Sequence, residues 1–204
     1  MSEKKKFFNN LAKTWDQRFY TKKLENFLHK LVPKFGLKKG YKILDVGTGT
    51  GILIPYLIKE IGINGEIVAI DYAKEMIEIC RSKYGHFSNV DFRVGNIEEI
   101  DHISGFFDFV ICFGVFPHIE KKYRALSQIN RVLKKEGRLI IAHALSSEEI
   151  QNHHQSSSSV VAHDNLPNEY QMKKLLTQTG FQKINIRNKP GCYLCSSVKA
   201  NDFN

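Results

Sequence analysis

A glycine-rich segment is the feature of this sequence most suggestive of ligand binding. Residues Ile43–Gly51 read Ile-Leu-Asp-Val-Gly-Thr-Gly-Thr-Gly, an apolar run that ends in an acidic residue and three alternating glycines. Glycines let the backbone pass close to a ligand and start a helix beneath it. A dinucleotide fingerprint would place its third glycine at position 52, where Ile52 stands. The Gly-Lys-Ser/Thr ending of a phosphate-binding loop is also absent, so the segment predicts another kind of ligand site.

Histidines could supply acid–base chemistry in two places, because a neutral imidazole can take up a proton near neutral pH. His118 follows an apolar run, at the edge where open α/β sheets bind ligands. A second group follows the next apolar run and comprises His143, His153, His154, His163 and Asp164. We expect His118, His143 and His154 to be catalytic. The alternative for His118 is a residue at a helix start that bonds only backbone.

A metal site is a second interpretation of this histidine group, because imidazole and carboxylate are common zinc or iron ligands. Adjacent His153 and His154 cannot point the same way from a helix, and His-x-x-x-His spacing is absent. We therefore predict no metal ligands. Cys192 and Cys195 form a lone Cys-x-x-Cys pair, and on a predicted strand their side chains face opposite sides.

Length and composition indicate one domain, spanning residues 1–204, with 42% hydrophobic residues to build a core. No run approaches the ~20 apolar residues of a membrane-spanning helix, and the first residues lack the pattern of a secretory signal. We expect a cytoplasmic protein with no membrane partner, in which disulfides are improbable.

The formal net charge of +9 suggests a nucleic-acid partner, because a basic surface attracts phosphate. The lysines come as scattered pairs, which favours a solvated surface instead. These pairs are Lys22-Lys23, Lys38-Lys39, Lys121-Lys122, Lys134-Lys135 and Lys173-Lys174.

Apolar runs rich in β-branched residues alternate with helical periodicity, which predicts an α/β fold with a mostly parallel sheet. Strands are predicted at Lys42–Val46, Glu66–Ile70, Val90–Val94, Phe109–Phe113 and Arg138–His143. Helices are predicted at Ile52–Ile61, Lys74–Tyr84 and Lys121–Leu133, the last closed by a lysine-rich turn and Gly137.

The two ends of the chain follow other patterns. The segment 1–38 is helical in pattern, with Leu24, Phe27, Leu28 and Leu31 at amphipathic spacing, and predicts a cover beside the site. A helix at Asn168–Thr179 precedes two strands, Phe181–Arg187 and Cys192–Lys199, whose short connection predicts an antiparallel hairpin at the sheet edge. Ser156–Ser159 is expected to be a mobile loop.

Together these motifs resemble class I S-adenosylmethionine-dependent methyltransferases, continuously from about Lys39 to Ala144. The glycine turn resembles the first signature motif, and Phe107–Val115 resembles the fourth-strand motif. Leu133–Leu139 resembles the Leu-Lys-Pro-Gly-Gly-x-Leu element, with Lys135 and Glu136 replacing Pro and the first Gly. The resemblance is to the small-molecule branch that includes quinone-ring and arsenite methyltransferases.

The resemblance implies a doubly wound, seven-stranded sheet with a C-terminal hairpin, and S-adenosylmethionine as cofactor. Asp71, at the end of the second strand, can accept both ribose hydroxyls, although an N-cap of the following helix is an alternative. Asn96 stands where the family usually holds adenine with an aspartate, and its carbonyl oxygen can still accept from the exocyclic amine. The implied cofactor residues are Asp45, Gly47, Thr48, Gly49, Gly51, Asp71, Tyr72, Met76, Asn96, Ile97, Phe113 and Gly114.

The resemblance also assigns covers to the site. Segment 144–167 corresponds to the insertion in which the family builds its substrate cover. Trp15 and Tyr20 correspond to aromatics that close over the sulfonium or the acceptor, where cation–π attraction would help. Core packing is the alternative, favoured for Trp15.

We therefore expect a methyltransferase that acts on a small molecule, as a monomer or homodimer. An RNA (tRNA or rRNA) methyltransferase is the first alternative, although the run after Phe113 lacks the Asn/Asp-Pro-Pro-Tyr/Phe motif of amino-methylating nucleic-acid enzymes. A non-catalytic module that binds adenosylmethionine or metal is the second.

Overall fold

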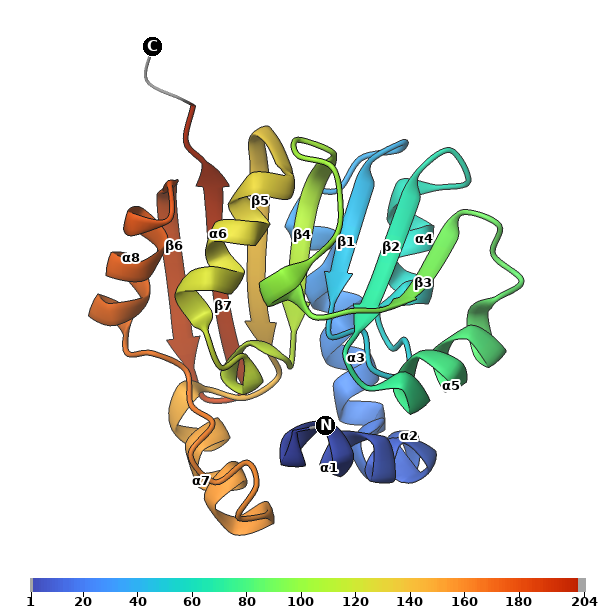
Figure 1. Ribbon diagram of the computed structural model, residues 1–204, viewed down its shortest axis with the longest axis vertical. Coiled ribbons are helices and arrows are strands. Elements are labelled where there is room, and N and C mark those ends of the chain that lie inside the picture. Colours follow the sequence, from blue (N-terminus) through green and yellow to red (C-terminus); the bar gives the residue numbers. More distant parts are fainter. Residues whose placement is uncertain (1, 202–204) are drawn as a thin grey trace. The chain divides into compact units, whose positions relative to one another are not determined.

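The computed structural model describes residues 2–201, and its strands follow the order β3-β2-β1-β4-β5-β7-β6 (Figure 1). The chain forms two compact units, one ending at Asn96 and the other beginning at Ile97. The predicted α/β fold, with seven strands and a C-terminal antiparallel hairpin, is confirmed. The single-domain organisation stays a prediction.

The first unit contains three parallel strands, β1 (Lys42–Val46), β2 (Glu66–Asp71) and β3 (Val90–Val94). Beyond their first residues, β1 and β2 are buried throughout, as expected for parallel strands covered on both faces. Val46 pairs with Ile70, so β1 and β2 end at the same edge of this part of the sheet.

Helices surround these three strands. They are α1 (Glu3–Leu11), η1 (Ala12–Thr14), α2 (Trp15–Phe19), α3 (Lys22–Leu31), η2 (Val32–Phe35), α4 (Ile54–Ile61) and α5 (Lys74–Tyr84). Helices α1 and α2 lie beyond the carboxyl ends of β1 and β2 (Figure 1). The helical pattern predicted for the first forty residues is confirmed, and Leu28 and Leu31 of α3 are buried as its spacing requires.

The second unit pairs β4 (Phe107–Phe113) with β5 (Leu133–His143) in parallel. The hairpin of β6 (Phe181–Lys189) and β7 (Cys192–Lys199) adds to β5 antiparallel, with Lys189 opposite Cys192. The helical elements are η3 (Ile97–Glu99), η4 (Phe116–His118), α6 (Lys122–Val132), α7 (Ser147–Ser157) and α8 (Glu169–Gln178).

The predicted stop of the sixth helix at Gly137 is wrong. Helix α6 ends at Val132, and the chain continues at once into β5, where Leu133 pairs with Phe107. Glu136, and not Gly137, has a positive φ of 58°. A Cβ on Gly137 would lie 2.9 Å from the Lys134 carbonyl oxygen, so this glycine permits a close approach of backbone. Strand pairing overrides the local helix-ending pattern.

Segment 144–167, expected to be a substrate-cover loop insertion, is helical in its first half, where it forms α7. Ser146 and Glu149 form a capping box, in which the Ser146 hydroxyl accepts from Glu149 N–H and the Glu149 carboxylate accepts from Ser146 N–H. Glu149 Oε2 also accepts from Gly191 N–H at 2.8 Å. Asn188 Oδ1 accepts from Ser147 N–H at 3.0 Å. The start of α7 is therefore held to the turn of the hairpin.

Ser156 and Ser157 belong to α7, whereas the next two serines follow its end. The loop predicted at Ser156–Ser159 is therefore wrong for its first two residues, which are helical. Serine is a weak helix former, and its side chain competes for backbone hydrogen bonds. In α7 the Ser156 hydroxyl donates back to the Asn152 carbonyl within the helix.

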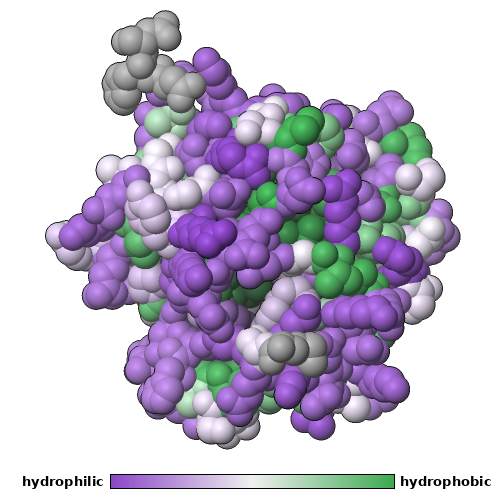
Figure 2. All heavy atoms as spheres, in the orientation of Figure 1, coloured by the Kyte–Doolittle hydropathy of each residue, from purple (hydrophilic) through white to green (hydrophobic). Residues whose placement is uncertain are grey.

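The surface is mostly polar on the face drawn in Figure 2. Lys122 and Lys134 are half-buried, and the other members of the five lysine pairs are exposed, as a solvated lysine surface requires. Within residues 2–201, no helix combines the length and the apolar character needed to cross a bilayer.

Replacing Ser146 with alanine removes the side-chain acceptor of the α7 capping box. We expect Ser146→Ala to lower the stability of α7 by about 1 kcal/mol, measured as faster amide hydrogen exchange of its first turn. Ser156→Ala is the matched control, because that hydroxyl bonds only carbonyls of its own helix. Equal exchange in the two variants would show that the capping box does not hold the helix.

Candidate cofactor site and histidine cluster

The glycine turn has the backbone that its sequence predicts. Gly47, Gly49 and Gly51 have φ values of 67°, 57° and 91°, in the left-handed region that favours glycine. Thr48 N–H donates to the Ile70 carbonyl at 3.0 Å, which joins the turn to β2. A Cβ on Gly51 would lie 2.6 Å from Cys80 Sγ and within 2.8 Å of the Tyr84 ring. This position therefore has neither the φ nor the space for a side chain.

Asp71 fixes the turn from the end of β2. Its Oδ2 accepts from Gly49 N–H at 3.0 Å, and its Oδ1 accepts from Ala73 N–H at 2.8 Å. The N-cap of α5 is Ala73, so the N-cap alternative for Asp71 is wrong. A carboxylate oxygen can accept more than one hydrogen bond. Binding of the ribose hydroxyls by Asp71 remains a prediction.

Two buried carboxylates lie in this part of the first unit. Asp45 is 1% exposed and Asp71 is 7% exposed. Burial raises the pKa of Asp45 to about 7, an effect opposed by the Thr48 side chain and reinforced by the negative charge of Asp71. Burial also raises the pKa of Asp71 to about 6. A ligand carrying positive charge or hydroxyl donors would compensate for this buried negative charge.

The remaining predicted cofactor residues divide between the two units. In the first, the Tyr72 ring lies 6.1 Å from the Phe8 ring, Met76 is buried within α5, and Asn96 is exposed at the unit's end. Ile97, Phe113 and Gly114 belong to the second unit: Ile97 is buried, Phe113 ends β4, and Gly114 N–H donates to the Ala142 carbonyl at 3.0 Å.

Trp15 lies over the glycine turn. Its Nε1 is 3.9 Å from the position that a Cβ on Gly49 would occupy. The indole ring also packs 5.9 Å from Phe8 and 4.4 Å from Phe19. Trp15 is half-buried, so it packs on these rings at the side of the turn, and its closure over a ligand stays a prediction.

In the second unit, the structure brings His118, His154 and Asp164 together. His118 Nδ1 lies 2.8 Å from Asp164 Oδ2, and both side chains are 13% exposed. His154 Nδ1 is hydrogen-bonded to the Asp164 carbonyl oxygen, and the two imidazole rings are 4.8 Å apart. His163 is exposed, so the segment contributes Asp164 and His154 to the cluster but not His163. His153 instead faces Ser157, at 3.4 Å.

His143 ends β5 and is 7% exposed. Burial, together with the nearby His118 and His154, lowers its pKa to about 3. A group with this pKa stays neutral at working pH and is a weak base. His143 is therefore better suited to packing or hydrogen bonding than to accepting a proton.

Within the described part of the chain, no three His, Cys, Asp or Glu side chains are arranged to hold a metal ion. The four cysteines are free, and Cys195 is buried whereas Cys192 is half-buried. The metal-binding alternative thus gains no support from these residues.

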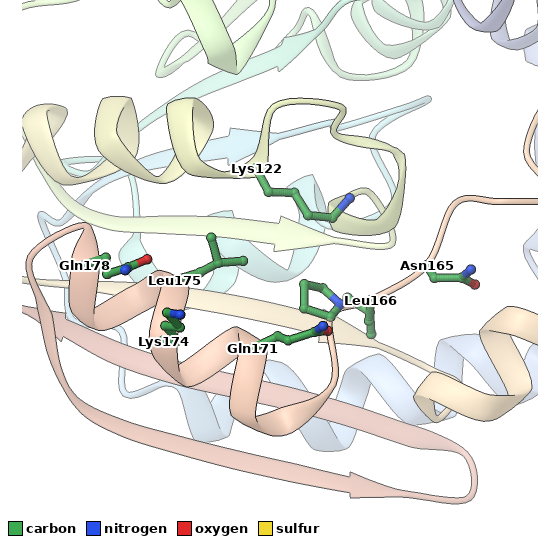
Figure 3. A pocket seen from close by; sticks show the side chains of 8 residues that line it. Lys122, Asn165, Leu166, Gln171, Lys174, Leu175 and Gln178 are labelled. Atoms are coloured by element: carbon green, nitrogen blue, oxygen red, sulfur yellow. The ribbon is translucent and has the colours of Figure 1, made fainter.

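A groove of about 510 Å³ in the second unit is lined by residues of α6, α8 and the segment between α7 and α8 (Figure 3). Lys122 and Lys174 contribute its charges, and Leu166 and Leu175 contribute apolar surface. Asn165, another lining residue, directly follows Asp164. Asn165, Leu166 and Pro167 of this lining belong to segment 144–167, the predicted substrate cover. No lining residue was predicted as a catalytic or cofactor-binding residue, because none stands in a recognisable motif.

A family model described as a methyltransferase domain matches residues 37–186. The match takes in the glycine turn, Asp71 and the histidine cluster. The chain belongs to the class I S-adenosylmethionine-dependent methyltransferases. This confirms the family that the motifs predicted. It also confirms S-adenosylmethionine as the cofactor.

Among curated proteins, demethylmenaquinone methyltransferase of Staphylococcus aureus (strain MRSA252) is 33% identical to this methyltransferase over 143 residues. The alignment covers 65% of this chain and 56% of the relative. The methyltransferase thus spans little more than half the length of this relative.

Solved structures share the fold. A SAM-dependent methyltransferase from Aquifex aeolicus has a TM-score of 0.71 at 24% identity, covering 85% of this chain and 89% of the other. Phosphoethanolamine N-methyltransferase 2 from Haemonchus contortus, in complex with S-adenosyl-L-methionine, has a TM-score of 0.71 at 17% identity, covering 86% of this chain and 53% of the other.

Replacing Gly51 with alanine tests whether the turn leaves room for a side chain at this position. We expect Gly51→Ala to lower the free energy of unfolding by about 2–4 kcal/mol, because φ strain adds to the clash with Cys80 and Tyr84. Gly40→Ala is the matched control, since Gly40 has a φ of 81° with nothing within 4 Å of an added Cβ, and should cost about 1 kcal/mol. Urea unfolding of both variants measures the difference, and equal losses would contradict the clash.

Ionisation of Asp45 should destabilise the free protein. Because its pKa rises from 3.8 to about 7 on folding, the loss of stability begins near pH 4 and is complete above pH 7. We expect Asp45→Asn to be more stable than wild type at pH 8 by about 1–3 kcal/mol, with a smaller difference at pH 5, and to bind S-adenosylhomocysteine more weakly. Urea unfolding at both pH values and calorimetric titration measure these effects. A variant less stable at pH 8 would show that the carboxylate is compensated in the free protein.

Proposed function

We propose that this methyltransferase transfers a methyl group to a small-molecule acceptor and that His118 accepts the proton which the acceptor loses. The observation that carries the proposal is the His118–Asp164 pair, 2.8 Å apart and 13% exposed on each side. A shielded imidazole held by a carboxylate is the usual arrangement of a general base.

The cofactor site proposed for the first unit fits S-adenosylmethionine on two grounds. The left-handed glycine turn lets backbone approach a ligand, and the buried carboxylates of Asp45 and Asp71 match a molecule with a positively charged sulfur and an ammonium group. When bound, the cofactor supplies an activated methyl group. Asp71 is proposed to bind the ribose, and Asn96 the adenine.

His118 is proposed to act through Nε2. When its Nδ1–H donates to Asp164 Oδ2, the neutral ring carries its lone pair on Nε2. Nε2 would take up the proton that the acceptor loses on methylation, and the Asp164 carboxylate would stabilise the resulting imidazolium. The proton then leaves to solvent. His154, on the Asp164 carbonyl, is a positioning residue.

Small-molecule substrates are favoured by the demethylmenaquinone methyltransferase relative. The substrate-cover role of 144–167 is part of the same proposal, because α7 and the following segment supply His154 and Asp164.

The direct test measures transfer of labelled methyl from S-adenosylmethionine to separate acceptors. The acceptors are a short-chain demethylmenaquinone, in oxidised and reduced forms, a mixture of small phenols and amines, and total RNA. Label in a small molecule supports the proposal. Label only in RNA favours the RNA methyltransferase alternative, and cofactor binding without transfer favours the non-catalytic module.

Variants of His118 and Asp164 test whether His118 acts as the general base. We expect His118→Ala to lower kcat by about 10²–10⁴-fold and Asp164→Asn by a smaller factor, with the calorimetric Kd for S-adenosylhomocysteine unchanged. His163→Ala is the matched control, an exposed histidine beside Asp164, and should keep wild-type kcat. An unchanged kcat in His118→Ala would remove His118 from the reaction.

A further inference from the structure

A polar network links the N-terminal cover to the glycine turn and α5. Lys83 Nζ donates to Asp16 Oδ2 at 2.8 Å and to the Thr50 carbonyl at 3.0 Å. The Thr50 hydroxyl donates to Asp16 Oδ1 and is hydrogen-bonded to the Tyr20 hydroxyl at 2.9 Å. Lys83 also lies 5.2 Å from the ring centroids of Tyr20 and Tyr84. The Lys83 ammonium group thus binds both α2, through Asp16, and the glycine turn, through Thr50.

The network adds to the ring contacts of Trp15 in holding α2 in place. Helix α2 has five residues, none of them buried. A helix of this length is unstable alone and depends on tertiary contacts. Asp16 lies on α2 next to Trp15, the residue over the glycine turn. Whatever holds Asp16 therefore also holds the indole in place.

Thr50 connects the network to the glycine turn, where the cofactor site is proposed. It lies between Gly49 and Gly51 and is fully buried. Its carbonyl and its hydroxyl are both used by the network. The ion pair itself is only partly shielded, with Lys83 29% and Asp16 39% exposed. The network can therefore open without exposing a hydrophobic core.

We propose that Asp16, Thr50 and Lys83 form a latch that closes α2 and Trp15 over the cofactor, and that opening of this latch sets the rate at which the cofactor exchanges. The latch rests on the proposed function, since it controls access to the proposed S-adenosylmethionine site. Asp16 and Lys83 are positioning residues in this mechanism.

The latch has a kinetic signature because all of its groups belong to the protein. It can close with or without ligand, so it stabilises the closed forms of the free and the bound protein alike. Weakening it raises the fraction of open free protein and speeds opening of the complex. Both rate constants then rise, while their ratio, Kd, changes little. Loss of a residue that binds the cofactor directly would instead raise Kd.

The test is stopped-flow binding of S-adenosylhomocysteine, followed by tryptophan fluorescence. Trp15 is the sole tryptophan of the chain, so the signal comes from the cover itself. In Asp16→Asn and Lys83→Met we expect the association and dissociation rate constants each to rise about two- to fivefold, with Kd within about twofold of wild type. Lys22→Met, which removes the exposed Lys22–Glu25 pair of α3, is the control and should match wild type.

Acrylamide quenching of Trp15 tests closure without a cofactor. Both latch variants should show a larger quenching constant than wild type and Lys22→Met, with an unchanged urea midpoint for the isosteric Asp16→Asn. The latch is overturned if the quenching constant of both latch variants equals that of wild type. It is also overturned if their association and dissociation rate constants are unchanged, or if dissociation alone becomes faster and Kd rises. If wild-type protein binds no S-adenosylhomocysteine, the proposed function fails, while quenching still decides whether the latch closes.

Discussion

The glycine turn of the first unit depends on the two hydrogen bonds that Asp71 accepts. Its carboxylate reaches back from the end of β2 to Gly49 N–H and forward to Ala73 N–H. One buried side chain thereby sets the glycine turn and the start of α5 at the same time. A buried carboxylate is costly unless backbone donors or a cation compensate it, and here the donors do so only in part, since its pKa remains raised.

This constraint leaves buried negative charge beside the glycine turn. The residues that shape the turn bury two carboxylates, and ionisation of these carboxylates opposes folding. The histidine cluster of the second unit is built differently, because there the Asp164 carboxylate has the His118 imidazole as a partner, while His154 bonds the Asp164 backbone carbonyl.

Much of this could be predicted from local sequence. The three glycines required left-handed backbone, and the β-branched runs predicted five parallel-type strands and a hairpin. Asp164 was recognised beside the histidines, although its pairing with His118, across 46 positions, was not. Helix α7 was missed because its serines suggested a loop, whereas the capping box at its start outweighed them. The end of α6 was predicted to within one residue, but residues 134–137 were taken for a closing turn because the pairing of Leu133 with Phe107 depends on a distant strand. Asp16 and Lys83 lie 67 positions apart and carry no local signal of their contact.

The attachment of α7 to the hairpin turn has a consequence for how such enzymes diversify. Glu149 and Ser147 bond Gly191 and Asn188, so the stretch between them returns to its own starting point. It encloses α7, Asp164, α8 and β6, and thus carries two members of the histidine cluster. Residues 146–191 therefore form a segment whose two ends are hydrogen-bonded to each other. Exchanging it whole between relatives would preserve its internal anchors, whereas replacing α7 alone would break them.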